Sequence, residues 1–431
     1  MIDRYTRPAM GALWSEQNKF AVWLEIELLA SEKMAQMGLI PKDAPRRMRR
    51  NARFDARRIE RIEEKTRHDV IAFLTDVGRH LGKDEKYLHL GLTSSDVLDT
   101  ALSARKVRAG ELLLEVLQPL LGHTRGLARR YINTPIAGRT HGVFAEPTSL
   151  GLKFALWYAD LIRGRRRLKA AIHSIAVGKI SGAVGNFAHL DPGVEAYVCR
   201  RLGLRPAPIS TQVLQRDRHA EYIFAIAALG AAAEKIAQEI RLYHRTETGE
   251  MTEGFFAGQR GSSAMPHKKN PILCERICGL ARLLRGYVSP ALENVALWHE
   301  RDITHSSVER VIIPDATITL DYMFYLLNSV LGNLGVHPQR MRENLESSGD
   351  AVYSQRLLLA LADRLGSRDR AYAIVQKLAL HVTPEMPLRK CAQADATIKQ
   401  HLSKDEIDAA FDWGYYLRHA RTIMKRALAQ K

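Results

Sequence analysis

The hydrophobic residues of this chain follow a helical spacing. Apolar positions at i, i+3 and i+4 are common, while the alternation typical of half-buried strands is scarce. Within segment 212–250, which lacks proline, one continuous helix would extend about 57 Å, longer than an ordinary domain. The pattern predicts an all-α fold with an elongated central bundle. Its long helical segments are residues 148–176, 212–250, 272–289, 291–313 and 315–334.

The segment 225–233, AIAALGAAA, is apolar on more than one helix face. A helix that is apolar all round has to be buried all round. The bundle of one chain offers too few neighbours to cover it, so we expect oligomerisation through the middle segment. A thick monomeric bundle is the alternative that the pattern leaves open.

Composition and charge restrict the class of protein. Hydrophobic residues make up 46% of the 431 residues, which is enough for a large core and excludes a disordered chain. The formal charge of +17 favours an anionic partner: nucleic acid, an acidic membrane surface or a small polyanion. The chain starts without a secretory signal pattern, and its longest apolar run, 222–233, is too short to cross a bilayer. We expect a soluble, cytoplasmic protein.

The four cysteines do not indicate a metal site. Cys274 and Cys278 share a helix face, but no second pair or nearby histidine completes a tetrahedral set. Reduced thiols packed as small apolar groups are the better interpretation. The chain also has no Walker loop and no Gly-x-Gly-x-x-Gly after a strand, so we expect neither a metal nor a cofactor.

The densest group of polar residues is segment 261–271, GSSAMPHKKNP. Asn270 followed by Pro271 is a good helix start, with an N-cap and a proline in the first turn. The free amides of that helix would face Lys268 and the loop, so that a cation, an amide side chain and a helix N-terminus converge as an anionic group requires. An ordinary capped helix after a loop explains the local sequence equally well.

Three further segments have either a structural or a functional explanation. Residues 93–97 (TSSDV) offer hydroxyls that either cap a helix or bind a carboxylate or phosphate. Residues 66–69 (TRHD) fit a capping pattern, yet they place an arginine, His68 and an acid side by side. Residues 139–142 (RTHG) put His141 in a loop beside glycine, where it is a candidate general acid. Taken alone, each segment is more often structural.

The segment 298–310, WHERDITHSSVER, superficially looks like a zinc-binding helix. His299 and His305 are six residues apart, however, whereas such a site requires a spacing of four. Ser306 and Arg310 share a helix face at i, i+4, and this pair suits a phosphate. The inventory of histidines, serines and cations favours acid–base chemistry on a polyanion.

Taken together, these segments resemble the fumarase/aspartase superfamily. The run Gly-Ser-Ser-x-Met-Pro-x-Lys-x-Asn-Pro at 261–271 resembles its signature, and this match is highly specific. Within the superfamily the chain is most similar to the bacterial branch that acts on adenylosuccinate. The stretches that carry the resemblance are Arg4-Tyr5, 66–69, 91–100, 138–149, 210–220, 258–276 and 298–310.

The resemblance implies a nearly all-helical fold in which an elongated central helical bundle is flanked by two smaller helical domains. We expect the N-terminal domain at residues 1–111, the central long-helix and tetramerisation domain at 112–364, and the C-terminal domain at 365–431. The resemblance further implies a homotetramer whose active sites are shared between subunits, in agreement with the burial argument.

The implied activity is that of a carbon–nitrogen lyase that releases fumarate by β-elimination. Adenylosuccinate would give AMP, and the succinyl-aminoimidazole carboxamide ribotide (SAICAR) would give its carboxamide product (AICAR), both in purine nucleotide synthesis. The carbanion formed next to a carboxylate needs preorganised cations and donors. The expected partner is a small polyanionic nucleotide, rather than nucleic acid or a membrane.

By resemblance, His141 is the general acid and Ser262 the general base. His68 supports binding and acid catalysis, Lys268 stabilises the carbanion, and Glu275 orients His141. A serine hydroxyl is a very weak acid, so Ser262 needs loop closure that holds it as an alkoxide among backbone amides and Lys268. The phosphate is expected at Arg4, Tyr5, Arg301, Ser306 and Arg310, the purine side at Arg67, His68, Asp69 and Gln212, and the succinyl carboxylates at Thr93, Ser94, Thr140, Ser263, Lys268 and Asn270.

Two other classes of protein stay open at this point. A sister lyase would act on argininosuccinate, aspartate or malate, but these substrates lack the phosphate for which the arginines are suited. A non-catalytic protein would bind nucleic acid through its basic surface, but the chain has no aromatic–basic interleaving and no helix-turn-helix pattern. A substrate panel separates the first class from the expected activity, and salt-dependent RNA binding would favour the second.

Overall fold

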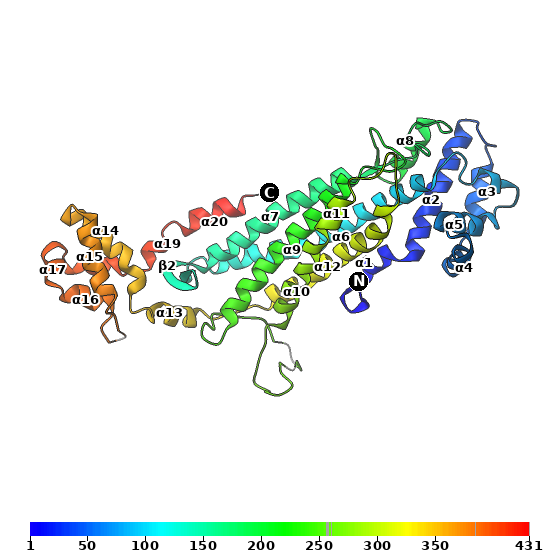
Figure 1. The fold of residues 1–431 in the computed structure, drawn as a ribbon. Coiled ribbons are helices and arrows are strands. Elements are labelled where there is room, and N and C mark those ends of the chain that lie inside the picture. Colours follow the sequence, from blue (N-terminus) through cyan, green and yellow to red (C-terminus); the bar gives the residue numbers. More distant parts are fainter. Residues whose placement is uncertain (256–257, 260, 384, 431) are drawn as a thin grey trace. The chain divides into compact units, whose positions relative to one another are not determined.

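The structure, a computed structural model, describes residues 1–430 except 256–257, 260 and 384. It is built mainly from helices, with short strands paired two by two (Figure 1), so the predicted all-α class is confirmed. The predicted boundaries after residues 111 and 364 stay a prediction. The chain forms two compact units: unit 1 comprises Met1–Gln118, Gly164–Ala233 and Gly279–Tyr325, and unit 2 comprises Pro119–Arg163, Glu234–Cys278 and Leu326–Lys431.

The long helices contain the boundaries between these units. Two of them differ from the prediction at identifiable residues. Helix α9 starts only at Asp217, because the Leu214 amide and the Arg216 guanidinium donate to the Asp99 carboxylate and hold the preceding segment out of the helix. Helix α12 runs through Pro314, whose cost of about 3 kcal/mol in a helix interior is outweighed by burial of this helix. The long helices are α6 (Ser94–Arg130), α7 (Leu150–Ile175), α9 (Asp217–His244), α10 (Ile272–Gly286) and α12 (Thr304–Gly332).

The segment before α12 corrects a second expectation. Residues 291–313 do not form one helix, because α11 (Val288–Glu293) ends early and α12 starts at Thr304. His299 has a left-handed backbone with φ 48°. The Asp302 carboxylate accepts hydrogen bonds from the amides of Trp298 and Thr304, at 2.7 and 2.8 Å, and so holds the chain in a turn. His299 therefore does not lie on a helix.

Unit 1 has a core of stacked and edge-on aromatic rings. The rings of Phe20, Trp23 and Phe73 lie with centroids 5.2 to 5.8 Å apart. These residues belong to α2 and α5 and are buried. The other elements of unit 1 are η1 (Asp3–Tyr5), α1 (Pro8–Trp14), α2 (Glu16–Gln36), α3 (Ala44–Asn51), α4 (Ala56–Thr66), α5 (Asp69–Gly78), η2 (Gly82–Tyr87), the parallel pair β3 (Val177–Gly178) and β4 (Arg205–Pro206), α8 (Pro192–Arg201) and α11.

Unit 2 contains an antiparallel hairpin where the sequence predicted a loop. Its strands β1 (Pro135–Thr140) and β2 (Val143–Ser149) are joined by His141 and Gly142, which have φ 54° and 80°. Two positive φ angles in a two-residue turn give the twist that a hairpin needs. The other elements of unit 2 are β5 (Met251–Thr252), β6 (Gly335–Val336), α13 (Pro338–Glu346), η3 (Ala351–Tyr353), α14 (Ser354–Leu365), α15 (Arg368–Ala379), α16 (Leu388–Ala394), α17 (Ala396–His401), α18 (Lys404–Ala410), α19 (Gly414–Leu417) and α20 (Ala420–Leu428).

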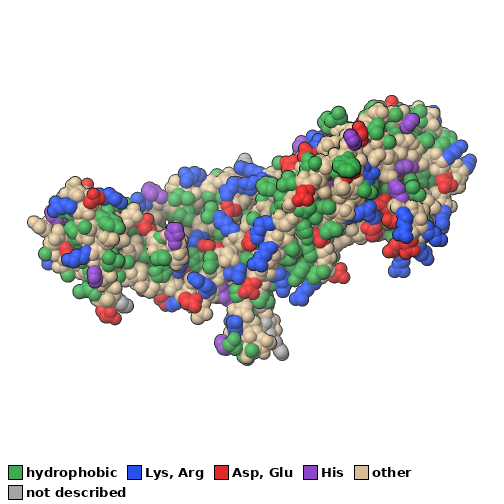
Figure 2. Space-filling model, in the orientation of Figure 1, with side chains coloured by type: hydrophobic (Ala, Val, Ile, Leu, Met, Phe, Trp, Pro, Cys, Tyr) green, Lys and Arg blue, Asp and Glu red, His purple; other side chains and the backbone are tan. Residues whose placement is uncertain are grey.

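The surface and the cysteines add two observations. Lys and Arg side chains are spread over the face shown in Figure 2 and are mixed with acidic and hydrophobic ones.

The four cysteines are free thiols, and Cys199, Cys274 and Cys278 are buried, in agreement with the predicted packing as small apolar groups. Within the described ranges, no helix combines the length and apolar character needed to traverse a bilayer.

Candidate active site

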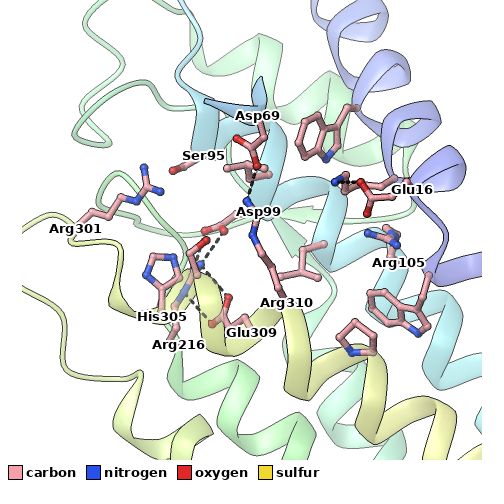
Figure 3. A pocket seen from close by; sticks show the side chains of 17 residues that line it. Glu16, Asp69, Ser95, Asp99, Arg105, Arg216, Arg301, His305, Glu309 and Arg310 are labelled. Carbon is pink, nitrogen blue, oxygen red and sulfur yellow. Dashed lines mark hydrogen bonds and ion pairs between the residues drawn. The ribbon is translucent and has the colours of Figure 1, made fainter. Parts of the chain in front are cut away.

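Unit 1 contains a cavity of about 220 Å³ between α2, α6 and α12. Four of the predicted substrate-binding residues line it, and Figure 3 shows Arg301 at one side with Arg310 reaching across the centre toward Asp69. Ser306 and Arg310, expected to share a helix face, both line this cavity from α12. The structure thus brings together Asp69, Arg301, Ser306 and Arg310.

The start of α6 leaves its hydroxyls available. Thr93 does not cap the helix through its side chain: the Asp96 carboxylate accepts from the Thr93 amide at 2.8 Å. Asp96 is in turn held by the fully buried Lys179 and by the amide of Ser181 at 3.0 Å. Among the described residues, no hydrogen bond engages the hydroxyl of Thr93 or Ser94. Capping, the more common explanation of this segment, is therefore carried by Asp96.

The 66–69 segment has a different cap from the predicted one. Thr66 is the last residue of α4, and Arg67 ends that helix with a left-handed backbone. His68 is the N-cap of α5, and its Nδ1 accepts from the Ile71 amide at 3.4 Å. Nδ1 also lies 3.7 Å from the Asp69 carboxylate, and both contacts involve this ring nitrogen rather than Nε2. Asp69, nearly buried, forms an ion pair with Arg310.

Of the other predicted residues of unit 1, Gln212 lies next to a cavity residue, whereas Arg4 and Tyr5 lie away from the cavity. Gln212 accepts from Arg301 at 3.0 Å and donates to the Ala183 carbonyl at 3.0 Å, so the purine-side and phosphate-side candidates touch. Arg4 and Tyr5 do not line the cavity. Arg4 is exposed on η1, and the ring of Tyr5 lies 5.2 Å from that of Tyr322.

A network of buried charges forms part of the cavity wall. Arg216 forms a two-pronged ion pair with Asp99 at 2.6 and 2.9 Å, and its Nε lies 3.2 Å from Glu309. His219 Nδ1 lies 3.0 Å from the same Glu309 carboxylate. Although burial alone would raise it, the charge of Arg216 keeps the pKa of Asp99 well below its usual value. The network ties α6, the 214–216 segment, α9 and α12 together.

Lys106 is the residue of this region whose positive charge is least compensated by its neighbours. It is fully buried, and its Nζ has no hydrogen-bond partner among the described residues. Burial lowers the pKa of Lys106 to about 7, and the nearby Glu309 charge only partly offsets this. Burial also lowers the pKa of His219 to about 4.

In unit 2, Ser262 lies in the loop that precedes α10. Its Oγ accepts hydrogen bonds from the amides of Ala264 and Met265, at 3.2 and 3.0 Å. These are amides of the kind that an alkoxide at this position requires. The loop folds closely on itself: the Gly261 carbonyl accepts from Asn270 Nδ2 at 2.9 Å, and a Cβ on Gly261 would stand 1.9 Å from the Lys268 carbonyl oxygen.

The N-terminus of α10 corrects the expectation that its amides await a substrate carboxylate. The amides of Leu273 and Cys274 donate to the Glu253 carboxylate at 3.0 and 2.9 Å, and the Ile272 amide donates to the Asn270 carbonyl. Glu253 is buried. The helix terminus does attract an anion, but that anion is supplied by the chain itself.

The remaining residues of unit 2 are largely exposed. Lys268, Asn270 and Glu275 line a second cavity, of about 710 Å³. His141 is exposed at the hairpin turn. The described part of the chain holds no hydrogen bond or ion pair between Glu275 and His141, so the predicted orienting contact is not formed within one copy. Thr140 and Ser263 are exposed as well.

The sequence interpretation missed the acids that hold these segments in place. Asp96 follows Thr93 at the capping-box distance, which is a detectable local signal. Asp99 and Glu253 bind backbone amides 115 and 20 to 21 residues away. No pattern in a single sequence indicates contacts of that separation.

Known proteins share this fold. A family profile described as Lyase matches residues 3–286. The structure is similar to that of a fumarate lyase from Mesorhizobium sp. BNC1, with 26% identity, 100% of both chains covered and a TM-score of 0.91. It is also similar to 3-carboxy-cis,cis-muconate lactonizing enzyme from Pseudomonas putida, with 27% identity, 99% and 97% of the chains covered and a TM-score of 0.90. The protein is a lyase with the fumarase/aspartase fold.

Sequence relatives narrow this class. A profile described as adenylosuccinate lyase C-terminus matches residues 350–427. The chain is 49% identical to adenylosuccinate lyase of Bacillus subtilis and 48% identical to that of Thermotoga maritima, each over 427 residues and 99% of both chains. The chain belongs to the adenylosuccinate lyase family.

Proposed function

We propose that this protein cleaves adenylosuccinate to AMP and fumarate, and SAICAR to AICAR and fumarate. The observation that carries the proposal is the 49% identity to an adenylosuccinate lyase over 99% of both chains. The cavity of unit 1 supports it, because Arg301, Ser306 and Arg310 offer two guanidinium groups and a hydroxyl to a phosphate.

Binding of the nucleotide would have to break one ion pair. Arg310 is paired with Asp69 in the structure. A phosphate placed between Arg301 and Arg310 would take over the Arg310 guanidinium. Asp69 would then be released to accept a hydrogen bond from the purine side, the part of the substrate for which it was predicted.

The elimination would proceed with the residues implied by the family resemblance. Ser262 Oγ would take the proton from the carbon next to a carboxylate, and the amides of Ala264 and Met265 would stabilise its alkoxide form. The electron pair left on that carbon would form the double bond of fumarate as the carbon–nitrogen bond breaks. Lys268 would stabilise the charge on the carboxylate during this step.

The departing nitrogen needs a proton. His141 would supply it as general acid, and His68 would donate a hydrogen bond from Nε2, since its Nδ1 is occupied by the Ile71 amide. Thr93 and Ser94 would bind a succinyl carboxylate with their unengaged hydroxyls.

We further propose that the protein acts as a homotetramer with active sites shared between subunits. The central helices expose large apolar side chains that one copy leaves uncovered: Phe224 is 55% and Tyr325 51% exposed in unit 1, and Leu156 is 50% exposed in unit 2. Glu275 also lacks its predicted partner, His141, within one copy. A contact from another copy would satisfy both. The cytoplasmic location stays a prediction.

A substrate panel tests the proposed activity. Purified protein should release fumarate from adenylosuccinate without added metal, and AMP should appear in equal amount. Faster turnover of argininosuccinate, aspartate or malate would contradict the proposal in favour of a sister activity. Absence of turnover together with salt-dependent RNA binding would favour a nucleic-acid-binding protein.

A further inference from the structure

The unit 1 cavity extends beyond the residues expected to bind substrate. Along α6 it runs from Ser95 to Arg105, ten residues or about 15 Å of helix. Ser95 follows directly after Thr93 and Ser94, which are predicted to bind substrate. Arg105 therefore lies at the end of the cavity that is far from these residues along α6. Figure 3 shows Arg301 and Arg105 at opposite sides of the cavity.

The cations that line this cavity are not equally compensated. Lys19 pairs with Glu16, Arg216 with Asp99, and Arg310 with Asp69. Within the described residues, Arg301 and Arg105 have no carboxylate at ion-pair distance. Arg301 is already a candidate ligand of the substrate phosphate, which leaves the charge of Arg105 unexplained.

Arg105 is held in a fixed orientation. Its side chain is nearly buried, with 8% of the residue exposed, and its Nε donates to the Leu13 carbonyl at 3.1 Å. The guanidinium lies over the ring of Trp14, 4.6 Å from its centroid, and Trp14 is anchored by its Nε1 donating to Thr317 at 2.8 Å. The two terminal nitrogens have no hydrogen-bond partner among the described residues.

A nearly buried guanidinium without a counter-ion lowers the stability of the folded protein. Arginine stays protonated in proteins, and a buried charge without a partner is strongly unfavourable. Burial lowers the pKa of Arg105 to about 10, although the charge of Glu16 acts in the opposite direction. The free edge of a fixed guanidinium matches the two oxygens of a carboxylate or phosphate.

We propose that Arg105 and the cavity wall around it form a second anion-binding subsite, which takes a small carboxylate or phosphate separately from the phosphate of the nucleotide. The apolar part of this wall is formed by Trp14, Trp23, Leu102 and Pro314, and the Glu16–Lys19 ion pair lines the cavity beside them. Such walls favour a carboxylate on a flat carbon skeleton. Fumarate has this chemistry, so the subsite would let the released acid, or inorganic phosphate, bind beside the nucleotide.

This inference rests on the proposed function only in taking AMP as the ligand of the nucleotide site. The experiment uses the full-length protein carrying Ser262→Ala, so that AMP and fumarate are not joined during the measurement. This protein is saturated with AMP and titrated by calorimetry with fumarate and separately with inorganic phosphate. Arg105→Gln should weaken the binding of the preferred anion about tenfold or more. Arg105→Lys keeps the charge but loses the planar pair of N–H donors. Its affinity for the anion should fall between that of Arg105→Gln and that of the wild type.

Arg108→Gln is the matched control. Arg108 lies on the same helix but is half exposed and paired with Glu111 and Glu115, so its loss should leave anion binding unchanged. The melting temperature without anion checks that Arg105→Gln folds. Tighter binding of fumarate assigns the subsite to a carboxylate, and tighter binding of phosphate assigns it to a phosphate.

Two results would overturn the proposal. Unchanged binding of both anions by Arg105→Gln would show that Arg105 is not a ligand. Loss of AMP affinity in Arg105→Gln as large as in Arg301→Gln would place Arg105 in the nucleotide site. Turnover of adenylosuccinate by the wild type is measured separately, so failure of the proposed function is distinguishable from failure of the subsite.

Discussion

The candidate residues of unit 1 and those of unit 2 are held in opposite ways. In unit 1, residues next to the predicted ligands are buried and bonded: Asp99 and Arg216 are only 4% and 2% exposed, and they fix the segment that carries Gln212. In unit 2, His141 and Lys268 stand exposed on a turn and a loop. The segments around the nucleotide site are thus held in place before the ligand arrives, although Arg310 has to leave Asp69, whereas the groups expected to move protons await further contacts.

This difference follows from what each task requires. A phosphate is bound well by cations whose orientation is fixed before the ligand arrives. The proposed base, Ser262, instead has to be shielded from water to act, which a loop that closes over the substrate achieves. The predictions below test this division, from the largest expected effect to the smallest.

The largest effect is expected at the groups of unit 2 that are proposed to move protons. Ser262→Ala and His141→Ala should each lower kcat by about 10²–10⁴-fold, the usual contribution of acid–base catalysis. Neither side chain belongs to a core. The melting temperature should therefore stay within about 2–4 °C of the wild-type value, which corresponds to a change of about 1 kcal/mol in the free energy of unfolding. His381→Ala, a change of another exposed histidine of unit 2, should leave kcat unchanged. Retained activity in either of the first two variants would remove the assigned role.

The buried network of unit 1 should respond in stability. Asp99→Asn removes the charge that compensates Arg216, and loss of one partner of a buried pair costs about 3–5 kcal/mol. Chemical denaturation measures this change. Asp43→Asn breaks a surface pair with Arg47 instead and should cost at most about 1 kcal/mol. Equal effects of the two substitutions would contradict the stabilising role assigned to the buried network of unit 1.

The loop of unit 2 should depend on a close backbone approach. Gly261→Ala places a Cβ against the Lys268 carbonyl, which displaces Ser262 and Lys268 together. A displacement of about 1 Å can cost about 10²-fold in rate, so kcat should fall with little change in melting temperature. Gly279→Ala on α10, where a Cβ meets no neighbouring atom, is the control. Wild-type kcat in Gly261→Ala would show that the loop geometry does not matter.

The smallest effect concerns Lys106. Its pKa in the folded protein, about 7, lies below the usual value of 10.5, so between these two values the unfolded chain holds more protons. The free energy of unfolding should therefore fall as the pH is lowered from about 10 to about 7. Lys106→Met should remove this dependence and stabilise the protein by about 1–4 kcal/mol at pH 7. Denaturation at several pH values measures both, and a less stable variant would count against an uncompensated amine.

The sequence predicted the helical fold well because helical spacing is a local property. It missed the limits of α9, which depend on Asp99, and it missed the hairpin, since His141 and Gly142 do not form one of the common turn pairs. It identified residues around the unit 1 cavity through their resemblance to a family. It did not identify Glu253, whose contact with α10 exists only once the chain has folded.

The proposed mechanism requires that a binding set in unit 1 and a reacting set in unit 2 act together in sites assembled from several copies. The most direct test mixes two inactive variants, His68→Ala from unit 1 and Ser262→Ala from unit 2, and allows their subunits to exchange. The account predicts that fumarate release from adenylosuccinate reappears in the mixture, because some sites then receive both intact residues from different copies. A mixture that exchanges subunits and stays inactive would contradict it.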